Sequence, residues 1–222
     1  MPYEYKQFSR RKLPQIHSPG STICTTFRLA GSIPKDVLRQ WLAEKSSRDK
    51  AVIRNEPSIE FNRRWFARFE EILDKAETGP RWLADSRVAQ IVANSLRYRD
   101  GRVYDLSAYS IMSAHVHAVF TPLLNAASLT EVKNSHPLRF VSSDPTLSAI
   151  MQSLKGYTAH EANKVLGRSG PFWEVESYDH EIKDEEEYGR VIRYVLNNPV
   201  KAGLVSHWSE WRWNYRKGTT GC

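Results

Sequence analysis

The sequence predicts an α+β fold, a ferredoxin-like antiparallel sheet with helices packed on one face. The main observation is the order of the segments, which follow one another as strand, helices, strand, strand, helix, strand, helix. A second observation is the pair of strands over 104–112 and 115–120, whose short connection predicts an antiparallel hairpin. With 222 residues, the chain is long enough to bury a sizeable core and is most simply one domain with elaborations.

The first half of the chain predicts one strand followed by helices. A β-branched, Thr-rich run over 21–29 predicts the first strand, and the Gly-Ser-Ile-Pro segment at 31–34 ends it and begins a helix. Helical periodicity runs over 35–44 and again over 58–75, with a charged connection between them. The second stretch carries an apolar stripe at spacings of three and four residues, which is typical of a core-facing helix: Phe61, Trp65, Phe69 and Ile72.

The second half predicts the remaining strands and helices. An amphipathic helix over 86–96 precedes the hairpin, and a further helix over 147–166 precedes a strand over 172–182. Between the hairpin and the second of these helices, the polar stretch over about 123–145 is too long for an ordinary connection and is predicted to be a loop insertion.

Two histidines stand at the centre of the predicted sheet. In the second strand of the hairpin, His115 and His117 flank a valine, so both side chains point to the same face of the strand. Two adjacent imidazoles suit a divalent metal ion, although an isolated His-x-His is more often a pair of solvated or hydrogen-bonded histidines. A metal site therefore needs a third ligand from elsewhere in the chain.

The best source of that ligand is a well-signalled helix over 184–199. Asp184 is placed to cap its N-terminus with Glu187 three residues on, and Pro199 is expected to close the far end. Tyr194 and Asn198 stand four residues apart and therefore share one face of the helix. If the helix covers the histidine strand, it presents a phenol and an amide oxygen to the two imidazoles.

Further sequence blocks accompany the histidine strand and this helix, at 26–34, 79–83, 170–173 and 198–205. With them the chain resembles the REP-associated tyrosine transposases, a branch of the single-tyrosine HUH transposases and nucleases, and the blocks follow the family's order over nearly the whole chain. His-x-His alone is a weak signal, whereas His-x-His followed by Tyr-x-x-x-Asn-Pro-Val-Lys-Ala-Gly is a strong one. The family usually has Met-Pro-Asn before the first histidine. This chain has Met-Ser-Ala at 112–114, which leaves the ligands intact but puts the turn that aims them in question.

The resemblance implies metal-dependent cleavage and transfer of single-stranded DNA near a short palindromic hairpin. It implies that Tyr194 is the nucleophile and forms a 5′-phosphotyrosine intermediate, and that His115, His117 and Asn198 bind Mg²⁺ or Mn²⁺. The phenol of Tyr157 is a weaker candidate, because Glu161 stands four residues on in place of an amide.

Two other functions compete with this interpretation. One is a nucleic-acid-binding regulator that keeps the transposase fold without strand cleavage. The altered turn and the loop insertion are the features that favour this alternative. The other is a zinc-dependent hydrolase, for which the chain lacks the usual cysteine or carboxylate ligands. A covalent adduct between the protein and labelled hairpin DNA distinguishes the enzyme from the regulator.

The charge balance favours a polyanionic partner. The formal net charge is +7, the isoelectric point is near 9.4, and seven Trp with ten Tyr offer flat surfaces for stacking unpaired bases. A dispersed, solvated basic surface is the alternative. The candidate DNA-binding residues are spread over an N-terminal arm, several inner positions and the tail: Arg10, Arg11, Lys12, Arg81, Trp82, Lys155, Lys164, Arg168, Arg193, Lys201, Trp211 and Arg212.

Three regions are expected: a basic N-terminal arm over 1–20, the transposase domain over 21–206, and an aromatic and basic tail over 207–222. The tail either clamps single-stranded nucleic acid or is a Trp-anchored segment that covers the sheet. Cys24 and Cys222 show no metal-ligand or disulfide spacing, and Cys24 is expected to pack as a small apolar residue. No signal peptide or membrane span is apparent, so we expect a cytoplasmic protein that joins the nucleoid when bound to DNA, as a monomer or homodimer.

Overall fold

The computed structural model describes residues 20–34, 79–123 and 146–218, together with the isolated positions 36, 37, 39, 40, 43 and 73. The arm over 1–19, the loop insertion over 124–145 and most of the predicted helices over 35–44 and 58–75 lie outside the described residues. In chain order, the elements of the described residues are β1 (Ile23–Arg28), η2 (Trp82–Ala84), α3 (Ser86–Arg99), β2 (Tyr104–Ile111), β3 (His115–Pro122), α4 (Leu147–Val165), β4 (Tyr178–Glu181), α5 (Glu185–Lys201), η4 (Trp208–Glu210) and β5 (Asn214–Arg216).

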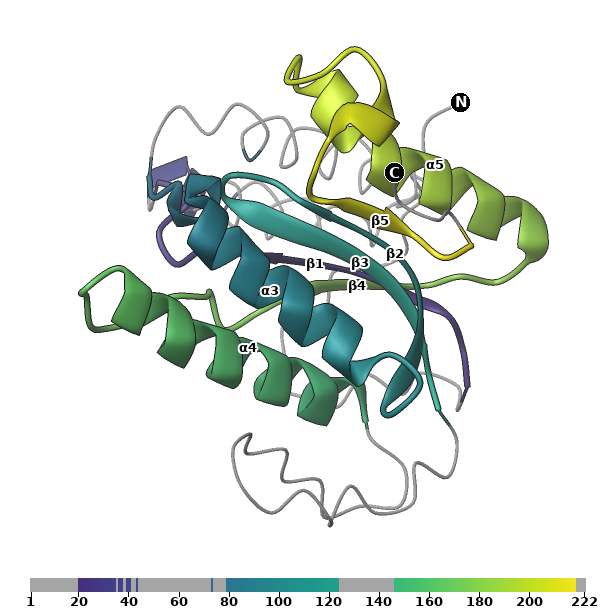
Figure 1. Cartoon of the computed structure of the whole chain (residues 1–222), viewed down its shortest axis with the longest axis horizontal. Helices are drawn as coiled ribbons and strands as arrows, with labels where there is room; N and C mark the ends of the chain where they lie inside the picture. Colours follow the sequence, from purple (N-terminus) through teal and green to yellow (C-terminus); the bar gives the residue numbers. More distant parts are fainter. Residues whose placement is uncertain are drawn as a thin grey trace.

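The five strands form one antiparallel sheet in the order β4-β1-β3-β2-β5 (Figure 1). The first four strands of that order are those of a ferredoxin-like sheet, and β5 adds a fifth at the β2 edge. The histidine strand β3 is therefore central, paired with β1 on one side and β2 on the other. The predicted α+β class and its antiparallel sheet are confirmed.

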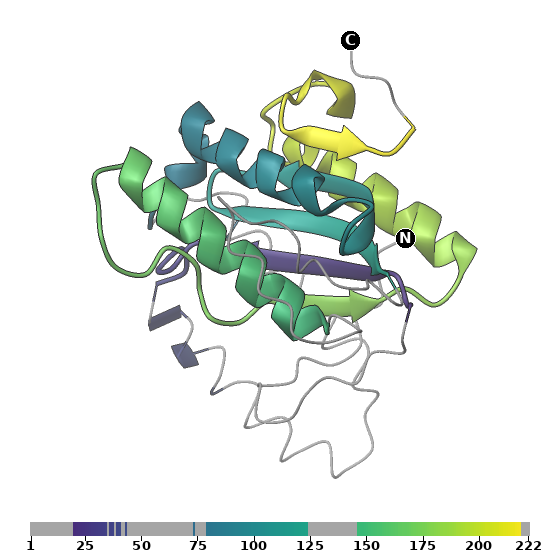
Figure 2. The same ribbon diagram turned by 60° about the horizontal axis from the view of Figure 1, so that its bottom comes forward.

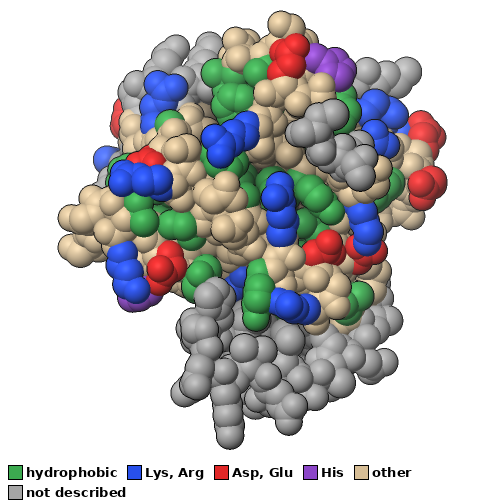
Figure 3. Space-filling model, viewed as in Figure 1, with side chains coloured by type: hydrophobic (Ala, Val, Ile, Leu, Met, Phe, Trp, Pro, Cys, Tyr) green, Lys and Arg blue, Asp and Glu red, His purple; other side chains and the backbone are tan. Residues whose placement is uncertain are grey.

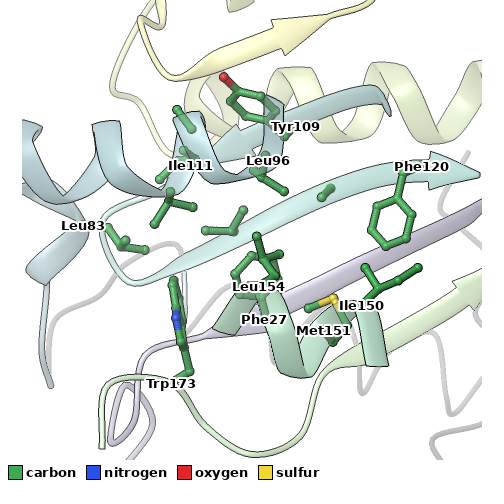
Figure 4. Packing of buried hydrophobic residues seen from close by; sticks show 14 of the residues in the cluster. Phe27, Leu83, Leu96, Tyr109, Ile111, Phe120, Ile150, Met151, Leu154 and Trp173 are labelled. Atoms are coloured by element: carbon green, nitrogen blue, oxygen red, sulfur yellow. The ribbon is translucent and has the colours of Figure 1, made fainter. Parts of the chain in front are cut away.

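Helices α3 and α4 lie side by side over one face of the sheet (Figures 1 and 2). The layer between them and the sheet is a buried apolar cluster, to which the strands contribute Phe27, Ile111 and Phe120 and α4 contributes Met151 and Leu154 (Figure 4). On the strands these side chains alternate with residues that point the other way, as the pleat requires.

Helix α5 packs against the opposite face of the sheet. A second, smaller cluster joins Cys24 and Val119 of the strands to Val191 and Val195 of the helix. The expectation that the helices share one face thus holds for α3 and α4 but not for α5. The reason is that β1 and β3 carry apolar side chains on both faces, so both faces need a covering layer. Cys24 is fully buried and packs as a small apolar residue, as predicted.

The predicted strand over 172–182 is shorter in the structure, since only Tyr178–Glu181 forms β4. Upstream of it, Trp173 makes a single isolated bridge to Leu29. The amide of Glu174 still donates to the carbonyl of Arg28 in β1 at 2.9 Å, but the carbonyl oxygens of residues 174–176 accept from the Lys155 ammonium at 3.0, 3.2 and 3.3 Å. These carbonyls are satisfied by a cation and not by a neighbouring strand.

Helix α5 runs two residues beyond Pro199, which had been expected to end it. The helix ends at Lys201, and Gly203, which follows the C-cap Ala202, adopts a φ of 70°. The amide of Gly203 donates to the carbonyl of Val200, and the amide of Leu204 donates to that of Pro199, both at 2.9 Å. This pair of hydrogen bonds is a Schellman cap, and it explains the Gly at this position of the 198–205 block.

The tail forms η4 and β5, and β5 pairs with residues Ala108, Tyr109 and Ser110 of β2. The Trp211 indole donates to the carbonyl of Ile111 at 3.1 Å, and Tyr215 stacks on Tyr109 at 5.3 Å between ring centroids. The described part of the tail is therefore anchored to the sheet edge by its aromatic residues. Within the described residues, no helix is long and apolar enough to cross a membrane.

Candidate active site

One row of side chains crosses the sheet on its α5 face. The Cα partners in this row are Tyr178 of β4, Thr26 of β1, His117 of β3 and Ser110 of β2. Directly paired residues of an antiparallel sheet point to the same face, so the four side chains share that face with His115, two residues from His117. The row is entirely polar although its central members, Thr26 and His117, are fully buried.

The two imidazoles meet at their outer nitrogens. His115 Nε2 lies 3.0 Å from His117 Nε2, and the rings are nearly perpendicular, with an interplanar angle of 85°. On its other side, His117 Nδ1 lies 2.8 Å from the Thr26 hydroxyl. When Nδ1 carries the ring proton and donates it to Thr26, Nε2 presents its lone pair, which is the tautomer that binds a metal ion.

Burial holds the pKa of His117 well below its usual value, and the positive charges of His115 and Lys201 lower it further. His117 is therefore neutral at neutral pH, and a neutral imidazole is the form that donates electrons to a metal.

Helix α5 carries the remaining candidates, Tyr194 and Asn198, and packs against the face of the sheet to which the histidines point. The Tyr194 ring lies 5.8 Å from the His117 ring between centroids, edge to face at 79°. One helical turn on, and so on the same face of the helix, the side chain of Asn198 is buried to 1% exposure. Neither amide atom of Asn198 has a hydrogen-bond partner within the described residues. A buried amide in that state costs about 1–3 kcal/mol, so it calls for a functional explanation.

The residues at hand fit a hard divalent ion. Two imidazole nitrogens converge, and a buried amide with an unused oxygen lies on the helix that covers them. No group of three or more His, Cys, Asp or Glu gathers in the described part of the chain, so the two histidines need a third ligand of another kind, for which the amide oxygen of Asn198 is the candidate.

The altered turn at 112–114 does not prevent the histidines from converging. The amide of Met112 donates to the carbonyl of His115, and the carbonyl of Ala114 accepts from the amide of Leu29, both at 2.9 Å. The carbonyl of Ser113 accepts from Leu83 at 3.2 Å. Backbone hydrogen bonds to two other segments thus fix this turn without the family's usual residues.

The other end of the tyrosine helix is equally fixed. The Asp184 side chain accepts from the amide of Glu187, as predicted, at 2.7 Å. The Glu187 carboxylate in turn lies 2.9 Å from His180 Nε2 and accepts from the amide of Lys183. The buried His180–Glu187 pair therefore ties the first turn of α5 to β4, two turns before Tyr194.

The rival phenol lies on the wrong side of the sheet. Tyr157 belongs to α4, which covers the face opposite to the histidines. The sheet itself separates Tyr157 from His115 and His117, whereas the Tyr194 ring contacts His117.

Several candidate DNA-binding residues have structural roles. Lys155 holds the 174–176 backbone, as described above. The Arg168 guanidinium donates to Asn163 and to the carbonyl of Pro171, and it lies over the Trp82 ring at 3.7 Å. Trp82 also stacks on Phe172, with ring centroids 5.4 Å apart. Lys164 forms an exposed pair with Glu161 at 3.1 Å.

The other candidates lie at the surface. Arg81, Arg193, Lys201 and Arg212 are exposed, and Arg212 lies over the Trp213 ring at 4.8 Å. Trp211 is half-buried at the sheet edge. Lys and Arg side chains are scattered over the face seen in Figure 3, with apolar side chains between them, and do not form one block. Arg10, Arg11 and Lys12 lie outside the described residues.

Sequence reasoning missed two residues beside the histidines. One is Thr26, the hydrogen-bond partner of His117. The other is Arg28, the Cα partner of His115, which is nearly buried and pairs with Ser32 at 3.2 Å and Glu174 at 3.3 Å. Both belong to the first predicted strand at a spacing of two. Their spacing was visible in the sequence, but their register against β3 was not.

Comparison with known proteins agrees with the fold. The sequence matches no protein-family model and no curated protein. The structure is similar to that of a REP-associated tyrosine transposase bound to a REP hairpin, with a TM-score of 0.51 and 15% sequence identity. The match covers 92% of this chain and 82% of the other. The resemblance is therefore confirmed at the level of the fold.

Proposed function

We propose that the protein is a metal-dependent nuclease and strand transferase that cleaves single-stranded DNA beside a hairpin-forming repeat. The observation that carries this proposal is the pair of histidine nitrogens 3.0 Å apart with the Tyr194 ring against His117, on the face covered by the helix that also carries the buried amide of Asn198. The similar fold of a protein that binds a REP hairpin supports the choice of DNA substrate.

His115, His117 and Asn198 would hold Mg²⁺ or Mn²⁺. When bound, the ion polarises the scissile phosphate and offsets charge that develops on its oxygens. Thr26 fixes the ring of His117, and the caps at both ends of α5 fix Asn198 relative to the strand.

Tyr194 supplies the nucleophile. Its phenolic oxygen forms a bond to phosphorus as the bond from phosphorus to the 3′-oxygen of the preceding nucleotide breaks. The phenolic proton is lost and the 3′-oxygen gains a proton, which leaves a 5′-phosphotyrosine and a free 3′-hydroxyl. Because phenolate is also a good leaving group, the step is readily reversed, and a second 3′-hydroxyl is then joined to the phosphate. This favours strand transfer over hydrolysis.

The test compares Tyr194→Phe with Tyr157→Phe. Each change removes one hydroxyl and keeps the ring, so both variants should fold. With Mn²⁺ and labelled hairpin DNA that carries single-stranded flanks, Tyr157→Phe should form the covalent adduct and Tyr194→Phe should form none, as seen on a denaturing gel. Peptide mass mapping should place the adduct on Tyr194. The released strand should be extended by a polymerase, and an adduct on Tyr157 or a 3′-phosphate end would refute the assignment.

Chelation tests the role of the metal. Removing the ion should abolish the adduct while hairpin binding persists, because Lys and Arg contacts to phosphates supply most of the affinity. Equal loss of binding and cleavage would mean that the metal is structural. Binding without any adduct, at every metal tried, would identify the protein as a regulator with the transposase fold.

A further inference from the structure

A groove of about 400 Å³ runs along the flank of α5, beside the face that carries Tyr194. Its other walls are the tail segments η4 and β5 and the middle of β2 at Ser107. We call it the α5–β5 groove. Its volume lies within the range of about 300–1,000 Å³ that small-ligand pockets occupy. None of its lining residues takes part in the convergence of histidines, tyrosine and asparagine described above.

Part of the groove lining is aromatic and apolar. Ile192 and Leu196 form part of its lining and are nearly buried, and the rings of Tyr188 and Trp208 flank them. The backbone of Trp208 is tied to α5, because its carbonyl accepts from the Asn214 side chain at 2.8 Å and the same side chain donates to the carbonyl of Leu196 at 2.9 Å. Aromatic rings beside apolar side chains suit a flat base.

The rim of the groove is basic. Arg193, Arg216 and Lys217 line it, against the single carboxylate of Glu185. Lys217 contacts Asp105, whose carboxylate raises the pKa of the lysine, so part of its charge is offset locally. The planar guanidinium groups of Arg193 and Arg216 suit phosphate oxygens.

We propose that the α5–β5 groove binds one nucleotide of the single strand that flanks the cleavage site. The base lies on Tyr188 or Trp208, and the neighbouring phosphates lie on Arg193 and Arg216. Arg193 and Asn197 of the groove directly precede Tyr194 and Asn198, so the helix that carries the nucleophile also holds the strand. This inference rests on the proposed function for its biological role but not for the binding itself.

The first experiment measures binding of a fluorescent oligothymidylate of ten nucleotides, which forms no hairpin, to the full chain without metal. Arg193→Gln with Arg216→Gln should weaken binding about tenfold and lower the slope of log K against log salt by about 1.4, since each phosphate contact on a single strand contributes about 0.7. The matched control is Arg190→Gln with Arg102→Gln, which removes the same charge outside the groove. Equal losses in both double variants, or no loss in the groove variant, would overturn the proposal.

The second experiment locates the base. Oligonucleotides with one 5-iodouracil are irradiated on the protein, and the cross-linked peptide is sequenced. Cross-links at Tyr188 or Trp208 support the groove, whereas cross-links confined to other aromatic residues overturn it. Both readouts are independent of cleavage, so a wild-type protein that forms no adduct yet meets both expectations would refute the proposed enzyme and keep the binding site.

Discussion

Against α3 and α4, the sheet presents apolar side chains such as Phe27, Ile111 and Phe120, whereas the row of side chains toward α5 contains Thr26 and His117. Burial of apolar side chains stabilises the fold, whereas burial of polar side chains costs stability unless they are hydrogen-bonded. Asn198 makes the difference clearest, because its amide is buried without a hydrogen-bond partner within the described residues. The face toward α3 and α4 is mainly apolar and stabilises the fold. The face toward α5 buries polar groups that the proposed chemistry needs, and this burial lowers the stability.

The sharpest test of this contrast is Asn198→Leu. The change replaces the buried amide with an apolar side chain of similar size, so adduct formation on hairpin DNA should fall more than a hundredfold while the free energy of unfolding stays equal or rises by about 1 kcal/mol. Asn198→Asp keeps a ligand oxygen and should retain part of the activity. The measurements are a denaturing gel and urea unfolding without metal. A leucine variant that keeps its activity would remove Asn198 from the metal site.

The opposite result is expected on the other face. Leu154 is fully buried between α4 and the sheet, so Leu154→Ala should cost about 2–5 kcal/mol of unfolding free energy in urea titrations. Adduct formation well below the melting temperature should be unchanged. Val165→Ala, on the same helix but 37% exposed, serves as control and should change stability by less than about 0.5 kcal/mol. A selective loss of activity in Leu154→Ala would show that the two faces are coupled.

A smaller effect is expected from Thr26→Val, which keeps the shape of the side chain and removes the hydroxyl that contacts His117. Loss of a partner that orients a metal-bound histidine typically lowers metal affinity by about 10- to 100-fold. Titration calorimetry with Mn²⁺ measures this directly. Ser110→Ala is the control, because Ser110 flanks His117 on the other side but hydrogen-bonds to Met112. If both variants bind Mn²⁺ equally, Thr26 has no orienting role.

The sequence was sufficient for those parts of the fold in which local pattern and tertiary structure agree. The hairpin was predicted from the alternation of its strands and from turn signals, and α5 from its helical period and the capping residue Asp184. Both elements are present, and Asp184 caps α5 as predicted. The pattern misled where long-range contacts decide. Alternation over 172–177 suggested a strand, but a lysine from α4 binds its carbonyls, and Pro199 suggested a helix end that Gly203 provides.

Site residues show the same division. Sequence spacing was enough to predict that His115 and His117 share one face of a strand and that Tyr194 and Asn198 share one face of a helix. Each pair lies on one regular element, whose period fixes the side-chain directions. Thr26 and the α5–β5 groove depend on strand register and on where the tail returns, and neither is encoded by local spacing. Lys155 and Arg168 were chosen for their charge, but the structure uses them to hold backbone carbonyls and an aromatic ring.

The two edges of the sheet bear on how the protein behaves at high concentration. Its outer strands are short, with four residues in β4 and three in β5, and β4 carries Asp179 and Glu181. Long, flat and uncharged edges recruit strands from other chains, whereas short or charged edges resist such pairing. By laying β5 along the central part of β2, the tail shields an eight-residue strand that would otherwise be open to self-association. Truncation before β5 is therefore expected to produce aggregates and not merely a weaker DNA-binding protein.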